Sequence, residues 1–175
     1  MSLDNDEERG RLIVVGVSPA TGSPLALQWA ATEARYRTAP LHAVMAWRLP
    51  RTQAGPGGSP PAFLPAGPEQ LQAEADARLT AAVRNALGTR QRVTCMAVRG
   101  SAVKVLLTAT ENAQLLVLDS PHSGNTATLR PGLIAPQVIY RAQCPVVMVP
   151  PSPTPRSLSA LRQGHAIPNS GQRTR

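Results

Sequence analysis

The chain has 175 residues, a length that suits one folded domain with additional terminal segments. Hydrophobic residues make up 42% of the chain but aromatic residues only 3%, so we expect alanine, valine and leucine to fill the core. The formal net charge is +8, yet the basic residues are scattered and no aromatic-rich strand or zinc-ligand spacing accompanies them, which argues against direct binding of nucleic acid.

The two ends of the chain differ in composition from its middle. Residues 1–10 are acidic and lack the basic start and apolar run of a signal peptide, and no apolar stretch is long enough to span a bilayer. We therefore expect a cytoplasmic protein that does not associate with membranes. Residues 151–175 are rich in Pro, Ser, Arg and Gln and predict a disordered basic tail. The folded domain is expected to span residues 11–150.

Short apolar runs alternate with helical patterns between residues 11 and 150. Continuous apolar runs predict strands at 11–17 and 114–118, and further strands are predicted at 41–47, 92–98 and 145–149. Helices are predicted at 24–36, 68–87, 101–109 and 136–142, with Ser23 and Ser101 as N-caps and Gly88 ending the second helix. The apolar face of the first helix is expected to include Tyr36. Residues 48–67 are crowded with Pro and Gly and predict a flexible loop.

This alternation predicts an α/β fold, a three-layer doubly wound sandwich around a five-stranded, mainly parallel sheet with strand order 3-2-1-4-5. Such sheets bind ligands beyond the carboxyl ends of their strands, where the strand order reverses. Here that crevice lies between the first and fourth strands. The positions expected at the crevice are Val17, Ser18, Ala46, Asp119, His122, Gly124, Gly132 and Leu133.

Four segments of this pattern resemble the universal stress protein family. They are Leu12 to Val17, Ala26 to Ala30, Leu41 to Trp47 and Ala142 to Val149, and the resemblance spans about residues 11–150. It implies the predicted fold and a dimer formed by pairing of the last strand. It also implies, for ATP-binding members, an acidic residue after the first strand and a loop of Gly, two residues, Gly, nine residues, Gly, then Ser or Thr.

Most of that nucleotide pattern is lost in this chain. By position, Ser18 replaces the acidic residue, and Asp119 and His122 replace the first two loop glycines. The third glycine is retained as Gly132, and Leu133 replaces the hydroxyl residue. Side chains then fill a space where phosphate needs close backbone N–H donors, and Asp119 adds negative charge. The resemblance therefore implies a branch of the family without ATP, and we expect no cofactor.

The alternative hypothesis is that the altered loop still binds a nucleotide. Gly124 and Asn125 can form a different anion-binding turn, and His122 can add positive charge at mildly acidic pH. The alternative is thus a nucleotide-binding stress sensor that takes ATP or AMP with Mg.

The last strand carries the dimer prediction. Val146, Val147, Met148 and Val149 form an apolar strand at one edge of the sheet, and an unpaired edge invites pairing. The alternative is that the tail after Pro150 folds back over this edge. The preferred hypothesis is a non-enzymatic homodimer in stress response or regulation, with protein partners.

Catalytic and metal sites find little support in the sequence. Ser18, Asp119 and His122 supply the residue types of a hydrolase triad, but no Gly-x-Ser-x-Gly elbow surrounds the serine. His42 has no second metal ligand at useful spacing. Cys95 and Cys144 are far apart in the sequence and are expected to be buried, reduced thiols. We therefore expect neither catalytic nor metal-binding residues.

Overall fold

The structure is a computed structural model that describes residues 11–49, 67–120 and 134–150. The acidic amino-terminal segment, residues 50–66 of the predicted loop, residues 121–133 and the tail lie outside the described residues. The predictions for those segments stay predictions.

Five parallel strands form the sheet. They are β1 (Leu12–Gly16), β2 (Leu41–Trp47), β3 (Thr94–Arg99), β4 (Ala113–Asp119) and β5 (Val146–Val149), in the order β3-β2-β1-β4-β5. Every neighbouring pair is parallel. The predicted α/β fold and strand order are confirmed. Strand order reverses between β1 and β4, so the crevice at the carboxyl ends of these strands is the natural place for a site.

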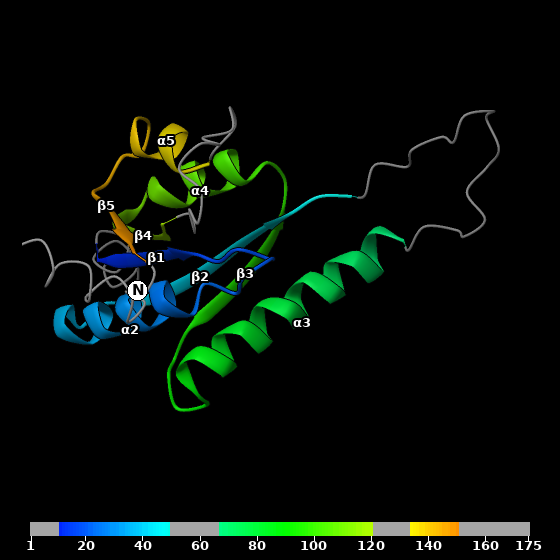
Figure 1. The fold of residues 1–175 in the computed structure, drawn as a ribbon, viewed down its shortest axis with the longest axis horizontal. Coiled ribbons are helices and arrows are strands. Elements are labelled where there is room, and N and C mark those ends of the chain that lie inside the picture. Colours follow the sequence, from blue (N-terminus) through cyan, green and yellow to red (C-terminus); the bar gives the residue numbers. More distant parts are fainter. Residues whose placement is uncertain (1–10, 50–66, 121–133, 151–175) are drawn as a thin grey trace, which may run out of the picture.

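Helices cover both faces of the sheet (Figure 1). Helices α2 (Pro24–Arg37) and α3 (Pro68–Leu87) lie on one face, and α4 (Ala102–Thr110) and α5 (Ile134–Ile139) lie on the other. Successive strand residues point to opposite faces, so Ile13 and Val15 join the core under α2 and α3 while Val14 joins the core under α4 and α5. Both cores are aliphatic, as the composition predicts.

The predicted elements differ from the observed ones mainly at their ends. The largest difference is in the last helix, which begins two residues earlier and ends three residues earlier than predicted. Pro136 is tolerated inside its first turn because that turn needs no N–H donor. After Ile139 the backbone closes a turn, in which Ala142 N donates to Val138 O at 2.7 Å, and then leads into β5.

Tyr36 was expected on the apolar face of the first helix, and that prediction is wrong. Its side chain is 83% exposed, whereas Leu27, Ala30, Ala31 and Ala34 are buried. The buried residues recur at intervals of three and four, and Tyr36 lies two residues after the last of them, so it points to solvent.

Ser23 and Ser101 occupy the predicted N-cap positions, but neither makes a side-chain capping bond. Ser23 has φ 49° and ψ 49° and is 1% exposed. Its Oγ accepts a hydrogen bond from Ser18 N at 3.0 Å. The hydroxyl therefore stabilises the turn that precedes the helix instead of the helix end.

The free edge of β3 is covered by a side chain of α3. Gly100 N donates to Trp47 O at 2.8 Å, so Gly100 faces β2, and Ala97, three residues earlier in an alternating strand, faces away from it. Gln72 Nε2 donates to this outward Ala97 O at 2.9 Å, and Gln72 Oε1 accepts from Trp47 Nε1 at 2.9 Å. One glutamine thus ties α3 to both β2 and β3.

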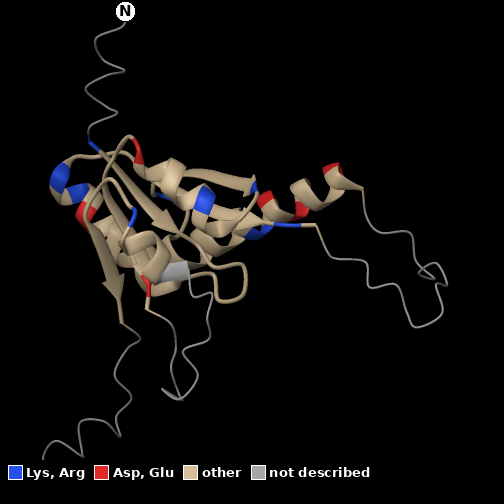
Figure 2. Cartoon of the chain, turned by 90° about the horizontal axis from the view of Figure 1, so that it is seen from above, with Lys and Arg blue, Asp and Glu red and all other residues tan. Residues whose placement is uncertain are grey.

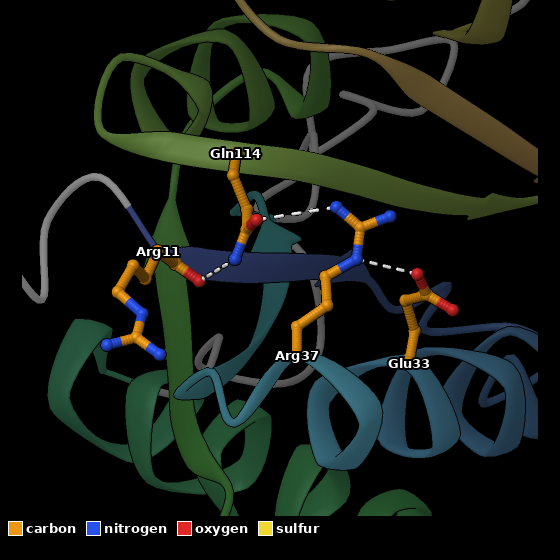
Figure 3. Close-up of polar contacts among 4 residues, drawn as sticks. All are labelled: Arg11, Glu33, Arg37 and Gln114. Atoms are coloured by element: carbon orange, nitrogen blue, oxygen red, sulfur yellow. Dashed lines mark hydrogen bonds and ion pairs between the residues drawn. The ribbon is translucent and has the colours of Figure 1, made fainter.

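A second polar group joins α2 to the amino ends of the central strands (Figure 3). Arg37 Nε pairs with Glu33 Oε1 at 2.6 Å, and its guanidinium also donates to Gln114 Oε1 at 3.3 Å. Gln114 Nε2 donates in turn to Arg11 O. The last turn of α2 is thereby joined to the starts of β4 and β1. Because these groups are exposed, the ion pair itself adds only about 0–1 kcal/mol.

Candidate functional site

A pocket with a volume of about 160 Å³ lies at the carboxyl ends of β1, β2 and β4. Four residues predicted at the crevice, Val17, Ser18, Ala46 and Asp119, all line it. The other predicted positions, His122, Gly124, Gly132 and Leu133, lie outside the described residues. The described lining is completed by Gly16, Pro19, Ser23, Val44, Ala102, Leu106 and Leu118.

The turn between β1 and α2 forms one wall of this pocket and satisfies its own polar groups. Ser18 N donates to Ser23 Oγ at 3.0 Å, Ala20 N to Ser18 Oγ at 3.3 Å, and Gly22 N to Ser18 O at 2.8 Å. Gly22 has φ 70°, a backbone conformation that glycine adopts without a Cβ penalty. These N–H groups bond within the turn, so they do not form a cradle for phosphate.

Two leucines close the floor of the pocket over Gly16. A Cβ on Gly16 would lie 2.6 Å from Leu118 Cδ2 and 3.1 Å from Leu106 Cδ2. The glycine thus leaves room for side chains from β4 and α4 to meet above β1. The resulting surface is largely apolar and suits an uncharged or flat group better than a polyphosphate.

Several lining residues escaped the sequence prediction. Ala102 and Leu106 come from α4, for which the sequence predicted a helix but no part in the crevice, and Ser23 was interpreted as a helix cap. One feature of the sequence could have indicated the lining residues of α4. This helix follows β3, and the first turn of a helix after a parallel strand lies at the carboxyl edge of the sheet.

Charge in the described part of the pocket is negative. Asp119 ends β4 and is half-buried, and none of the described lining residues is Lys or Arg. Two negative charges about 4 Å apart repel by roughly 1 kcal/mol even in bulk water, and by more where solvent is excluded. The described lining thus offers no counter-charge to a chain of phosphates.

The described residues include two of the three triad residue types, Ser18 and Asp119. Ser18 Oγ accepts from Ala20 N within its turn, and His122 lies outside the described residues. Across the described ranges, no three His, Cys, Asp or Glu side chains gather into a metal-binding group.

Both cysteines are free and only half-buried, whereas the sequence predicted buried thiols. Cys95 lies in β3 at the edge of the sheet, and Cys144 lies just before β5, at the other edge, where neighbouring elements cover a side chain on fewer sides. Burial raises the pKa of both thiols above its ordinary value. They are poorer nucleophiles than a free cysteine.

Comparison with known proteins identifies the chain. The profile of the universal stress protein family matches residues 11–150, which is most of the sequence. The chain belongs to the universal stress protein family. No curated protein matches the sequence. No helix within the described ranges of this universal stress protein is long and apolar enough to cross a membrane.

Solved structures show the same fold. Universal stress protein UspA from Lactobacillus plantarum matches with a TM-score of 0.56 and 22% identity over 81% of this chain and 98% of its own. A universal stress protein in complex with cAMP matches with a TM-score of 0.50 and 22% identity, covering 79% and 95% of the two chains. One from Archaeoglobus fulgidus in complex with dAMP matches with a TM-score of 0.50 and 20% identity, covering 78% and 94%.

Proposed function

We propose that this universal stress protein is a non-enzymatic homodimer that acts in stress response or regulation without using ATP. The observation that carries the proposal is the charge of the crevice. Asp119 stands at the carboxyl end of β4, where the family's phosphate loop begins, and the described lining holds no cation to offset it. A triphosphate brought there meets repulsion and finds the nearby turn N–H groups already bonded.

The unequal edges of the sheet support the dimer. Gln72 covers the outward carbonyl of Ala97 on β3, which blunts that edge. On β5, Pro145 O and Val149 O accept bonds from Leu116 N and Ser120 N at 3.0 and 2.8 Å. Residues 145, 147 and 149 therefore face β4, and the backbone groups of Val146 and Met148 face outward. A second copy related by a two-fold axis can pair with these groups as an antiparallel strand.

The dimer is tested by removing one outward donor. Met148→Pro deletes the Met148 N–H but leaves the ladder to β4 intact, and proline is tolerated on an edge strand. Two hydrogen bonds of about 0.5–1.5 kcal/mol are lost per dimer, so association should weaken roughly tenfold or more. Met148→Leu, which keeps the N–H, is the matched control, and circular dichroism checks the fold. Sedimentation that shows a wild-type monomer, or equal dimers in both variants, contradicts the proposal.

The absence of ATP binding is tested by thermal unfolding with millimolar Mg-ATP. A ligand that binds only the folded state stabilises it by about 2.7 kcal/mol at one hundred times its dissociation constant. We expect no saturable rise in the melting temperature of the wild type. Asp119→Asn removes the repelling charge and should improve any residual ATP binding about fivefold, whereas Glu111→Gln, an equal change of charge at the opposite edge of the sheet, should not.

A second candidate is binding of a nucleotide with a single phosphate. It is favoured by the apolar pocket, which can take a base, and by the solved relatives in complex with cAMP and dAMP. One phosphate carries less charge toward Asp119 than three. A saturable stabilisation by AMP or cAMP, with none by ATP, supports this candidate, and Gly16→Val, which fills the pocket floor, should abolish it.

A further inference from the structure

A second hollow lies at the opposite edge of the sheet, near the amino ends of its strands. It has a volume of about 400 Å³ and lies between the last turns of α2 and the segment that enters β3. Its described lining comprises Ala31, Ala34, Arg35, Thr38, Ala39, Leu41, Gln91 and Arg92.

This hollow is separate from the crevice. Leu41, which begins β2, lines the hollow, and Ala46, five residues along the same strand, lines the crevice. At about 3.3 Å per residue the two positions are roughly 17 Å apart. No residue lines both pockets.

Two arginines from different parts of the chain line this hollow. Arg35 belongs to the last turn of α2, and Arg92 lies two residues before β3. Both are exposed, and across the described ranges neither has a carboxylate within 4.0 Å. Arg37 differs, because its guanidinium is already engaged by Glu33 and Gln114 (Figure 3).

The negative end of a helix dipole explains one of these arginines but not the other. A basic residue in the last turn of a helix stabilises it, which accounts for Arg35. Arg92 is not part of a helix, so helix stability does not require its charge at the hollow.

The surroundings of the hollow are basic. Figure 2 shows basic residues together with an acidic one at the carboxyl end of α2, where Glu33 is paired with Arg37, and acidic residues toward the amino end of α3. Arg84, Arg90 and Arg92 lie in or after the last turn of α3, whereas Glu69, Glu74 and Asp76 lie in its first half. The field at the hollow therefore favours an anion.

We infer that this hollow binds a small organic anion, in which a carboxylate or phosphate is attached to a compact apolar group. The planar guanidinium groups of Arg35 and Arg92 suit the anionic end, since arginine forms paired hydrogen bonds with both carboxylate and phosphate. Ala31, Ala34 and Leu41 supply an apolar floor for the rest of the ligand. The amide of Gln91 and the hydroxyl of Thr38 add polar contacts at the rim.

The inference is tested by NMR titration of the full chain with benzoate and with phenyl phosphate. Saturable chemical-shift changes are expected at the backbone amides of Ala34, Thr38 and Gln91. The probe that binds more tightly shows whether the hollow prefers a carboxylate or a phosphate. Benzamide, the neutral analogue of benzoate, should produce no saturable shifts there.

The variants Arg35→Gln and Arg92→Gln should each weaken binding at least about tenfold, because each removes a charged hydrogen-bond donor. Arg99→Gln removes the same charge from an exposed arginine at the carboxyl end of β3 and should change the affinity less than about twofold. Unchanged melting temperatures verify that the variants fold. Equal weakening by all three variants, equal binding of benzamide, or the absence of saturable shifts with both probes would overturn the inference.

Discussion

Replacing Gln72 with alanine should destabilise the protein mainly through two partly buried partners that lose their hydrogen bonds, because its third bond, from Nε2 to Asp76 Oδ2 at 3.0 Å, is exposed and adds little. Trp47 Nε1 donates to Gln72 Oε1 at 2.9 Å, and Gln72 Nε2 donates to Ala97 O at 2.9 Å, both in partly buried surroundings. Each such bond contributes about 0.5–1.5 kcal/mol net, so their loss costs about 1–3 kcal/mol. Alanine is the better helix former by a few tenths of a kcal/mol, which offsets part of the cost. We expect a net loss of about 1–2.5 kcal/mol in the free energy of unfolding.

The measurement is urea unfolding at one fixed protein concentration, followed by circular dichroism, because association of the chain would add to its apparent stability. Gln70→Ala is the matched control, since Gln70 is an exposed residue of the same helix. Trp47→Phe keeps an aromatic ring but removes the indole N–H. In a double-mutant cycle, Trp47→Phe and Gln72→Ala should show a coupling of about 0.5–1.5 kcal/mol.

Two results refute this account of Gln72. A loss no larger than that of Gln70→Ala would mean that water replaces the glutamine without cost. Strict additivity in the cycle would mean that the indole and the amide do not stabilise one another. Conversely, a larger oligomer formed by Gln72→Ala alone would show that the glutamine also protects the β3 edge from pairing.

Three further predictions concern a histidine, the thiols and the core. Burial lowers the pKa of His42 below its ordinary 6.5, so acidification protonates the unfolded chain first, and stability should fall below that pH. Unfolding at pH 7.5 and 5.5 should show a smaller fall for His42→Gln than for the wild type, and equal falls would contradict this. Because burial raises the pKa of Cys95 and Cys144, alkylation at pH 8 should be slower than for a free thiol and should recover in urea; fast native labelling would count against it. Leu79→Ala removes a side chain with 0% exposure and should cost about 2–5 kcal/mol in urea unfolding, so a loss below about 1 kcal/mol would be inconsistent with its packing.

The elements of the fold were predictable because each depends on residues close together in the sequence. Leu41 to Trp47 is a mainly apolar segment between Pro40 and Pro50, and the observed β2 has the predicted bounds. Helix α5 was the poorest match, because it is short and its end depends on the turn into β5. The prediction for Tyr36 was wrong because this residue lies outside the buried stripe of α2. Apolar character alone therefore does not determine which face of a helix a residue occupies.

The candidate site was predictable only in part. Val17, Ser18, Ala46 and Asp119 follow from one rule, that parallel strands bring their carboxyl ends to one edge. Leu106 and Leu118 were missed because their meeting above Gly16 depends on how α4 packs on the sheet. Ser23 was assigned to the helix end, since nothing local shows that its hydroxyl accepts a bond from Ser18 five residues earlier.

The amino-acid sequence by itself determined the alternation of strands and helices, the family, the apolar last strand and the replacement of the phosphate-loop residues, because these are properties of single residues and short segments. Only the tertiary structure decided that Gln72 covers one edge of the sheet, that the turn after β1 uses its own N–H groups, and that Arg35 and Arg92 line one hollow. Arg35 and Arg92 are 57 positions apart in the sequence. Such contacts depend on the packing of elements that are distant in the chain, and local secondary-structure propensity does not predict that packing.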